Sequence, residues 1–63
     1  MTPTTHQGRV ALEWFNASGE RTRGRLRSLT DHFCHSGAIE DVETRAAIYR
    51  DAEMCARFEE DGQ

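Results

Sequence analysis

The stretch from Ala38 to Glu60 contains neither glycine nor proline, and this feature constrains the fold most. Four further alanines within it favour helix over other local structures. Three acids near its start, Glu40, Asp41 and Glu43, suit the positive end of a helix dipole. We therefore predict a long C-terminal helix over 38–60.

The apolar residues of this predicted helix do not share one face. At about 100° per residue they form three sets around its circumference: Ile39, Val42, Ala46 and Tyr49; Ile48, Ala52 and Cys55; Ala47, Met54 and Phe58. A helix that is apolar on several sides is covered by more than one surface. The pattern predicts either that two other helices of this chain flank it or that part of it docks on a second chain.

Residues 9–18 fit two local patterns. As a helix, Val10 and Trp14 lie four residues apart on one side, and Gly19 supplies a left-handed residue at the end. As a strand, Val10, Leu12 and Trp14 alternate with Ala11, Glu13 and Phe15, and a loop around Ser18-Gly19 turns the chain back. Ala, Leu and Glu favour helix, and an isolated hairpin is marginally stable, so helix is the preferred interpretation.

The segment 20–36 contains Leu26, Leu29 and Phe33 at helical spacing. Gly24 weakens its start by about 1 kcal/mol relative to alanine, so helix is predicted from about Arg25 to His35, with Gly37 as the stop. The first eight residues are polar, and we expect them to be loosely ordered. Taken together, the sequence predicts one small all-α domain over 1–63, with two or three helices.

The chain has only 63 residues and a formal net charge of −3. A chain of this size buries about 60% of its unfolded surface, which leaves little material for a water-excluding catalytic cavity. The charge is uneven. Residues 1–37 carry five arginines against three acids, or +2, and residues 38–63 carry three arginines against eight acids, or −5. We predict a protein that is not an enzyme and that needs no cofactor.

The expected location is the cytoplasm. No apolar run approaches the roughly 20 residues that cross a bilayer, and the start shows neither the basic nor the apolar part of a secretory signal. Cys34 and Cys55 are therefore expected to be free thiols. Arginine without lysine indicates a GC-rich genome, such as that of a high-GC bacterium, its phage or its plasmid.

One group of residues raises the question of metal or thiol chemistry. His32, Cys34, His35 and Cys55 are ligand types that zinc accepts, but no Cys-x-x-Cys pair is present. Adjacent side chains on a helix splay apart, so a thiol–imidazole pair is not expected at Cys34. We predict no metal site, with Cys34 packed near the core and both histidines at the surface.

Nucleic-acid binding is a further possibility. Arg21, Arg23, Arg25 and Arg27 form a short basic stretch, and Trp14 or Phe15 could stack on bases. A helix-turn-helix with its turn at Gly37 is unfavourable, because the recognition helix would begin with three acids that face DNA phosphates. The competing interpretation pairs the arginines with acids of the C-terminal helix.

The tail Ala56-Arg57-Phe58 followed by Asp61-Gly62, together with the overall length, resembles the plasmid copy-number regulators of the Rop type. This resemblance implies a helical hairpin that dimerises into a four-helix bundle and binds paired RNA loops. Gly8, Gly19 and Gly24 depart from the long first helix of that family. The alternative hypothesis is thus a small dimeric RNA- or DNA-binding regulator that uses the Arg21–Arg27 stretch.

The leading hypothesis is a protein-binding module. Acids on several faces of one helix can imitate a nucleic-acid backbone and cover a basic groove of a nucleic-acid-binding protein. In size and charge the chain resembles anti-CRISPR proteins, so we expect an inhibitor or adaptor from a phage or mobile element, as a monomer or a homodimer and without a membrane partner. The candidate partner-binding residues are Glu40, Asp41, Glu43, Asp51, Glu53, Glu59, Glu60, Tyr49 and Phe58. Trp14 and Phe15 are further candidate anchors.

Overall fold

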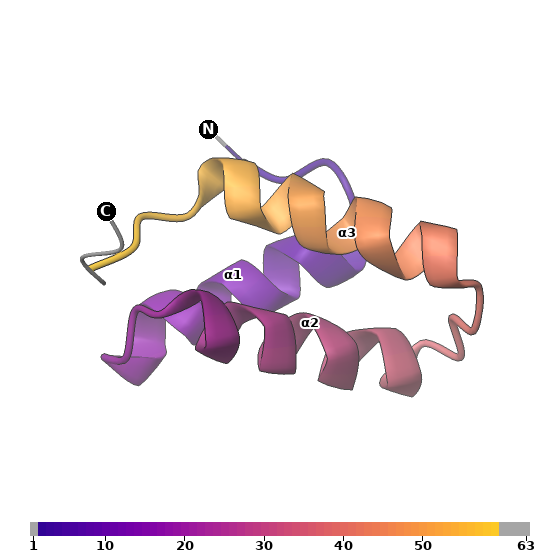
Figure 1. Ribbon diagram of the computed structural model, residues 1–63, viewed down its shortest axis with the longest axis horizontal. Helices are drawn as coiled ribbons and strands as arrows, with labels where there is room; N and C mark the ends of the chain where they lie inside the picture. Colours follow the sequence, from indigo (N-terminus) through magenta and orange to yellow (C-terminus); the bar gives the residue numbers. More distant parts are fainter. Residues whose placement is uncertain (1, 60–63) are drawn as a thin grey trace.

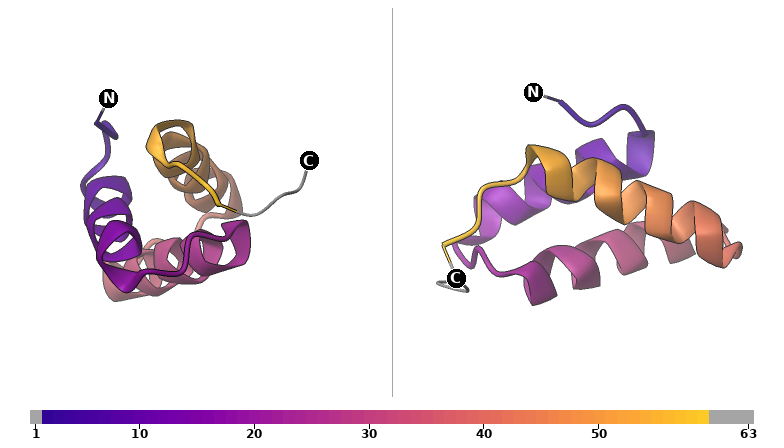
Figure 2. Two further views of the ribbon diagram at one scale, coloured as in Figure 1. Left: turned by 90° about the vertical axis from the view of Figure 1, so that its left-hand side faces the viewer. Right: turned by 45° about the horizontal axis from the view of Figure 1, so that its top comes forward.

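The computed structural model describes residues 2–59, in which three α-helices and no strands are present (Figure 1). The helices are α1 (His6–Ser18), α2 (Arg23–Ser36) and α3 (Val42–Cys55). Each packs against the other two, and the end-on view in Figure 2 shows them around a common centre. The all-α prediction is confirmed, as is helix rather than strand for the first element. The long C-terminal helix is not confirmed, since the helices have 13, 14 and 14 residues.

The first helix begins earlier than predicted. Thr5 is its N-cap and accepts a hydrogen bond from Gly8 N, so residues 6–8 are helical. Pro3 and Gly8 are buried, and Thr4 and Thr5 are hydrogen-bonded to Asp51 of α3. The expectation that residues 1–8 are loosely ordered is therefore wrong for residues 2–8. The Asp51 carboxylate, distant in the sequence, holds this segment in place. The predicted end at Gly19 is confirmed by a φ of 82° there.

The second helix also begins before its predicted start, because the Thr22 side chain caps it by accepting from Arg25 N. At its end, Ala38 N donates to His35 O and Ile39 N donates to Cys34 O. These are the two bonds of a Schellman motif. The left-handed residue is Ala38 at φ 58°, whereas Gly37 has φ −88°. The glycine stands one position before the residue that needs it.

Ala38→Gly is expected to stabilise the protein. At positive φ the Cβ of alanine lies too close to the following carbonyl oxygen, and glycine has no Cβ. The expected gain is about 1 kcal/mol, or about 4–8 °C in Tm. The matched control is Ala47→Gly at an exposed position of α3, which is expected to cost about 1 kcal/mol. Thermal unfolding followed by circular dichroism compares the two. A lower Tm for Ala38→Gly would contradict the assignment of strain to this turn.

The third helix is shorter than predicted at both ends. Asp41 caps its start by accepting from Thr44 N, and Arg45 Nε donates to Ile39 O, which fixes the preceding turn. At its end, Ala56 takes an extended conformation, with ψ 153°. Glu59 N then donates to Arg21 O across the molecule. The helix therefore ends where the following segment turns toward the connection between α1 and α2. No glycine or proline is present at this point in the sequence.

Phe58 explains why this segment leaves the helix. Its ring packs edge-on against Phe15, with centroids 5.6 Å apart, and the guanidinium of Arg23 lies 4.5 Å from its centroid. An aromatic pair in this arrangement adds about 0.5–1.5 kcal/mol beyond burial alone. Contact with the core thus offsets the loss of further helical turns.

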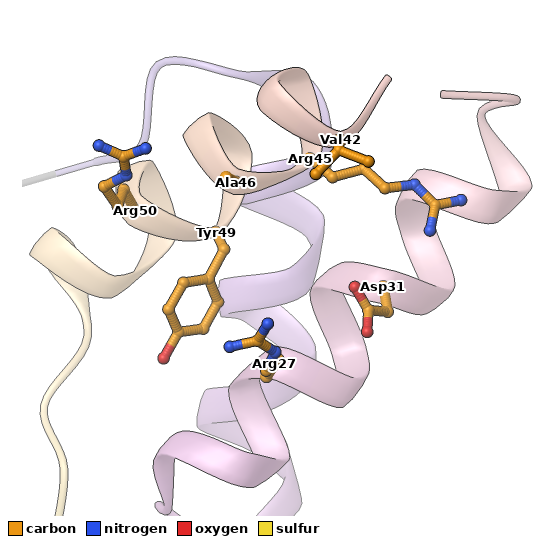
Figure 3. Close-up of a pocket in the computed structure, with 7 residues that line it drawn as sticks. All are labelled: Arg27, Asp31, Val42, Arg45, Ala46, Tyr49 and Arg50. Atoms are coloured by element: carbon orange, nitrogen blue, oxygen red, sulfur yellow. The ribbon is translucent and has the colours of Figure 1, made fainter. Parts of the chain in front are cut away.

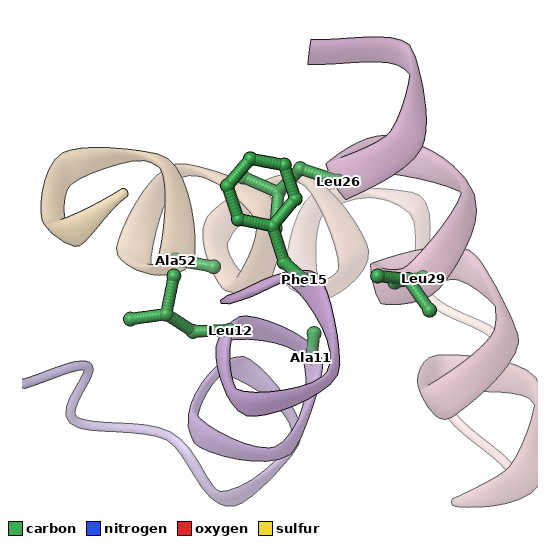
Figure 4. Packing of buried hydrophobic residues seen from close by; sticks show 6 residues of the cluster. All are labelled: Ala11, Leu12, Phe15, Leu26, Leu29 and Ala52. Atoms are coloured by element: carbon green, nitrogen blue, oxygen red, sulfur yellow. The ribbon is translucent and has the colours of Figure 1, made fainter. Parts of the chain in front are cut away.

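All three helices contribute to the core (Figure 4). Its buried cluster comprises Ala11, Leu12, Phe15, Leu26, Leu29 and Ala52. Ile48 and Cys34 are also buried, as is Thr30, whose hydroxyl donates to the carbonyl oxygens of Leu26 and Arg27. The buried hydroxyl of Thr30 therefore has hydrogen-bond partners.

The chain itself covers most of the apolar surface of α3. Ile48 and Ala52 are buried, and Tyr49 and Cys55 pack partly against the core. Val42 and Met54 remain 77% and 70% exposed. Of the two arrangements predicted from the apolar pattern, the structure shows the first, in which two other helices flank α3. Among residues 2–59, no helix is long and apolar enough to cross a membrane.

Candidate functional site

The Asp51 carboxylate accepts four hydrogen bonds from the start of the chain. Its Oδ1 accepts hydrogen bonds from Thr4 N (2.9 Å) and Thr4 Oγ1 (3.2 Å). Its Oδ2 accepts from Thr5 N (2.8 Å) and Thr5 Oγ1 (2.7 Å). Partial burial acts to raise the pKa of Asp51, but these four bonds outweigh it and lower the pKa to about 2. Asp51 is a structural residue that ties the start of α1 to α3.

Three other acids of the predicted set also have partners inside the fold. Hydrogen bonds from the Thr44 hydroxyl and amide lower the pKa of Asp41. Glu53 accepts from the Tyr49 hydroxyl at 3.2 Å and lies 3.6 Å from Arg23 Nε. Glu59 lies 4.0 Å from Arg21 Nε. These contacts spread the acids over separate parts of the molecule.

The rest of the predicted set divides into three cases. Glu40 and Glu43 are exposed, and their side chains have no hydrogen bond or ion pair within the part of the chain that the structure describes. Tyr49 and Phe58 are half-buried against the core. Glu60 lies outside the described residues. The eight described residues of the set therefore have different surroundings, and several of them are used inside the fold.

The His/Cys group is likewise dispersed. Over residues 2–59, no three His, Cys, Asp or Glu side chains gather in a metal-binding arrangement. The Cys34 thiol is buried, and burial raises its pKa, which Arg45 partly opposes. His32 instead packs edge-on against Phe33, with centroids 5.1 Å apart. A raised pKa keeps the Cys34 thiol protonated, the form that is a poor nucleophile and a poor metal ligand.

The basic stretch 21–27 does not form one face. Arg21 and Arg23 contact Glu59, Glu53 and the Phe58 ring, as described above. Arg25 lies on the α1 side of α2, where its Nε is buried without a hydrogen-bond partner among the described residues. Arg27 lies against the Tyr49 ring, 5.7 Å from its centroid. The competing interpretation, in which these arginines meet acids of the C-terminal segment, holds for the first two.

Trp14 is one of three large hydrophobic side chains that are exposed among residues 2–59, together with Val42 and Met54. Its side chain is 59% exposed and its ring centroid lies 6.0 Å from that of Phe33. An open cavity of about 350 Å³ lies beside it. This Trp14 surface is lined by Trp14, Arg25, Ser28, Leu29, His32 and Phe33. Phe15, the neighbouring candidate anchor, is fully buried in the core instead.

A second concave region lies between α2 and α3 (Figure 3). This α2–α3 groove has a volume of about 320 Å³ and is lined by Arg27, Asp31, Val42, Arg45, Ala46, Tyr49 and Arg50. Sequence reasoning did not single out Arg45 and Arg50. They are distant from Arg27 along the chain, so only the packing of α3 on α2 brings the three together.

No protein-family model matches this chain, and neither a curated protein nor a solved structure is significantly similar to it.

Proposed function

We propose that this protein is a non-enzymatic module that binds another protein, with Trp14 at the centre of the contact. The exposure of Trp14 on a packed helix, beside Arg25 and Phe33, carries this proposal. Tryptophan and arginine are the residue types that most often dominate interface energies. A tryptophan that projects from a rigid surface is suited to a pocket on a partner, and little ordering of the module is needed on binding.

More specifically, the proposed partner is a basic, nucleic-acid-binding protein of the cytoplasm. The module either inhibits this partner or acts as an adaptor for it. The net charge of −3 supports this, as do Glu40 and Glu43, which have no partners within residues 2–59. Such charges accelerate association with a basic surface and add less to the final affinity. An origin in a phage or mobile element remains part of this proposal.

The alternative, a dimeric nucleic-acid regulator that acts through residues 21–27, has less support. Arg21 pairs with Glu59, which follows α3, and Arg23 pairs with Glu53 of α3. Arg25 lies on the side of α2 that faces α1. These side chains do not point toward a shared ligand surface.

Trp14→Ala is expected to weaken partner binding by at least about 30-fold, the equivalent of the 2 kcal/mol that defines a hot spot. The matched control is Met54→Ala, which removes another exposed apolar side chain, on α3. The measurement compares capture of host proteins by the wild type and both variants, followed by titration of the captured protein. Trp14 is the sole tryptophan of this chain, so the fluorescence that this chain contributes to the complex reports burial at this position. A partner that binds both variants equally would contradict the proposal.

A further inference from the structure

We propose that the α2–α3 groove binds the phosphodiester backbone of a double-stranded nucleic acid through Arg27, Arg45 and Arg50. Three of the seven lining residues are arginines and only Asp31 is acidic, which gives the groove a net positive charge in an acidic protein. None of the three arginines forms an ion pair within residues 2–59. The groove therefore retains positive charge that the fold itself does not neutralise.

Two of the three arginines are held in place by contacts that leave their terminal nitrogens available. The Arg45 side chain donates only through Nε, to Ile39 O at 2.6 Å. Arg27 lies over the Tyr49 ring at 5.7 Å. Arg50 is exposed. A guanidinium that is already positioned loses less conformational entropy when it binds a phosphate.

The arrangement fits an extended polyanion better than a single phosphate. In Figure 3 the three guanidinium groups point in different directions around Tyr49 and do not converge. A lone phosphate requires converging donors, whereas successive phosphates of a backbone meet arginines placed along a surface. Val42 and Ala46 give the groove apolar walls against which sugars can pack.

Duplex is favoured over single strand because the groove offers no free aromatic face. Tyr49 is its only aromatic lining residue; its ring lies under Arg27 and its hydroxyl donates to Glu53. Single-strand binding normally depends on bases that stack on such rings. Contacts to phosphate alone carry no sequence information, so we infer binding that is independent of sequence and sensitive to salt.

The test measures fluorescence anisotropy with one short sequence as duplex DNA, as duplex RNA and as a single strand. Three phosphate contacts on duplex DNA predict a slope of about −2.7 in log K against log salt, or about 40-fold weaker binding at 200 mM than at 50 mM. Arg50→Ala is expected to reduce this slope to about −1.8, or about 12-fold over the same range. Arg50→Lys keeps the charge and is expected to retain the slope.

The matched control is Arg57→Ala, which removes the same charge from another exposed arginine, one that lies after α3 and does not line the groove. The salt slope of Arg57→Ala is expected to equal that of the wild type. Asp31→Asn removes the one negative charge of the groove lining and is expected to bind the duplex more tightly. Equal losses in Arg50→Ala and Arg57→Ala would overturn the proposal. So would tighter binding of the single strand than of both duplexes, or equal binding of a polyglutamate peptide. Trp14 does not line the groove, so Trp14→Ala is expected to leave this slope unchanged. Failure of the proposed groove is therefore distinct from failure of the Trp14 contact.

Discussion

Phe15→Ala is expected to leave the protein largely unfolded at ambient temperature. Phe15 is fully buried at the centre of the core cluster, and its ring also meets Phe58. Removing a buried phenylalanine side chain costs about 3–5 kcal/mol. A domain of this length has a total stability of about 3–9 kcal/mol. The loss thus equals the whole free energy of unfolding at the lower end of that range and is about half of it at the upper end.

Urea unfolding followed by circular dichroism measures this effect. Trp14→Ala is the internal control, because it truncates a larger side chain at the adjacent position of the same helix. Trp14 is 59% exposed and contacts mainly Phe33, so its stability cost is expected to stay near 1 kcal/mol. Equal destabilisation by the two variants would show that the core does not close around Phe15.

Asp51→Asn is expected to destabilise the protein by about 1–3 kcal/mol, although the side chain keeps its size. Four donors from Thr4 and Thr5 point at the two carboxylate oxygens. An asparagine offers one oxygen and one NH₂ group. The threonine hydroxyls can accept from that NH₂ group, but the backbone amide of Thr4 or of Thr5 then faces a donor. Thr5 Oγ1 also accepts from Gly8 N, so the cap of α1 depends on the same contact.

The pH dependence of the same contact has a definite sign. The folded-state pKa of Asp51 is about 2, below the ordinary value of 3.8, so the folded state favours the ionised form. Its contribution is fully present above about pH 4 and is lost as the pH falls toward 2. Water screens this partly exposed site, and about 1–2 kcal/mol is the expected size.

Chemical unfolding of the wild type and Asp51→Asn at several pH values isolates this contribution from those of other carboxyls. The difference in unfolding free energy between the two proteins is expected to shrink as the pH falls from 5 to 2. A difference that stays constant over this range would contradict the assigned role of the Asp51 charge. Glu43→Gln, which changes an exposed acid without a partner in residues 2–59, is the matched control.

Local signals predicted the helices because they act over a few neighbouring residues. The spacing of Leu26, Leu29 and Phe33 indicated α2, and Gly19 marked the end of α1. The caps Thr5 and Thr22 are also residue types that favour helix starts. These two caps explain why both helices begin before their predicted positions.

The candidate surfaces were less predictable, because each depends on which residues meet across helices. Among adjacent aromatics, Trp14 is exposed and Phe15 is buried, a choice that follows from the direction in which α1 faces its neighbours. Asp51 is indistinguishable from the other acids along the chain until Thr4 and Thr5 lie beside it. Arg45 and Arg50 join Arg27 only when α3 packs on α2.

The sequence alone determined that this chain is helical and where two of its turns lie, since both follow from short-range preferences and periodicity. Tertiary structure alone decided that α3 ends at Cys55 and that Phe58 returns to the core. It also decided which charges are used inside the fold and which remain at the surface. The reason is that contacts between distant residues outweigh local helix preferences of a few tenths of a kcal/mol per residue.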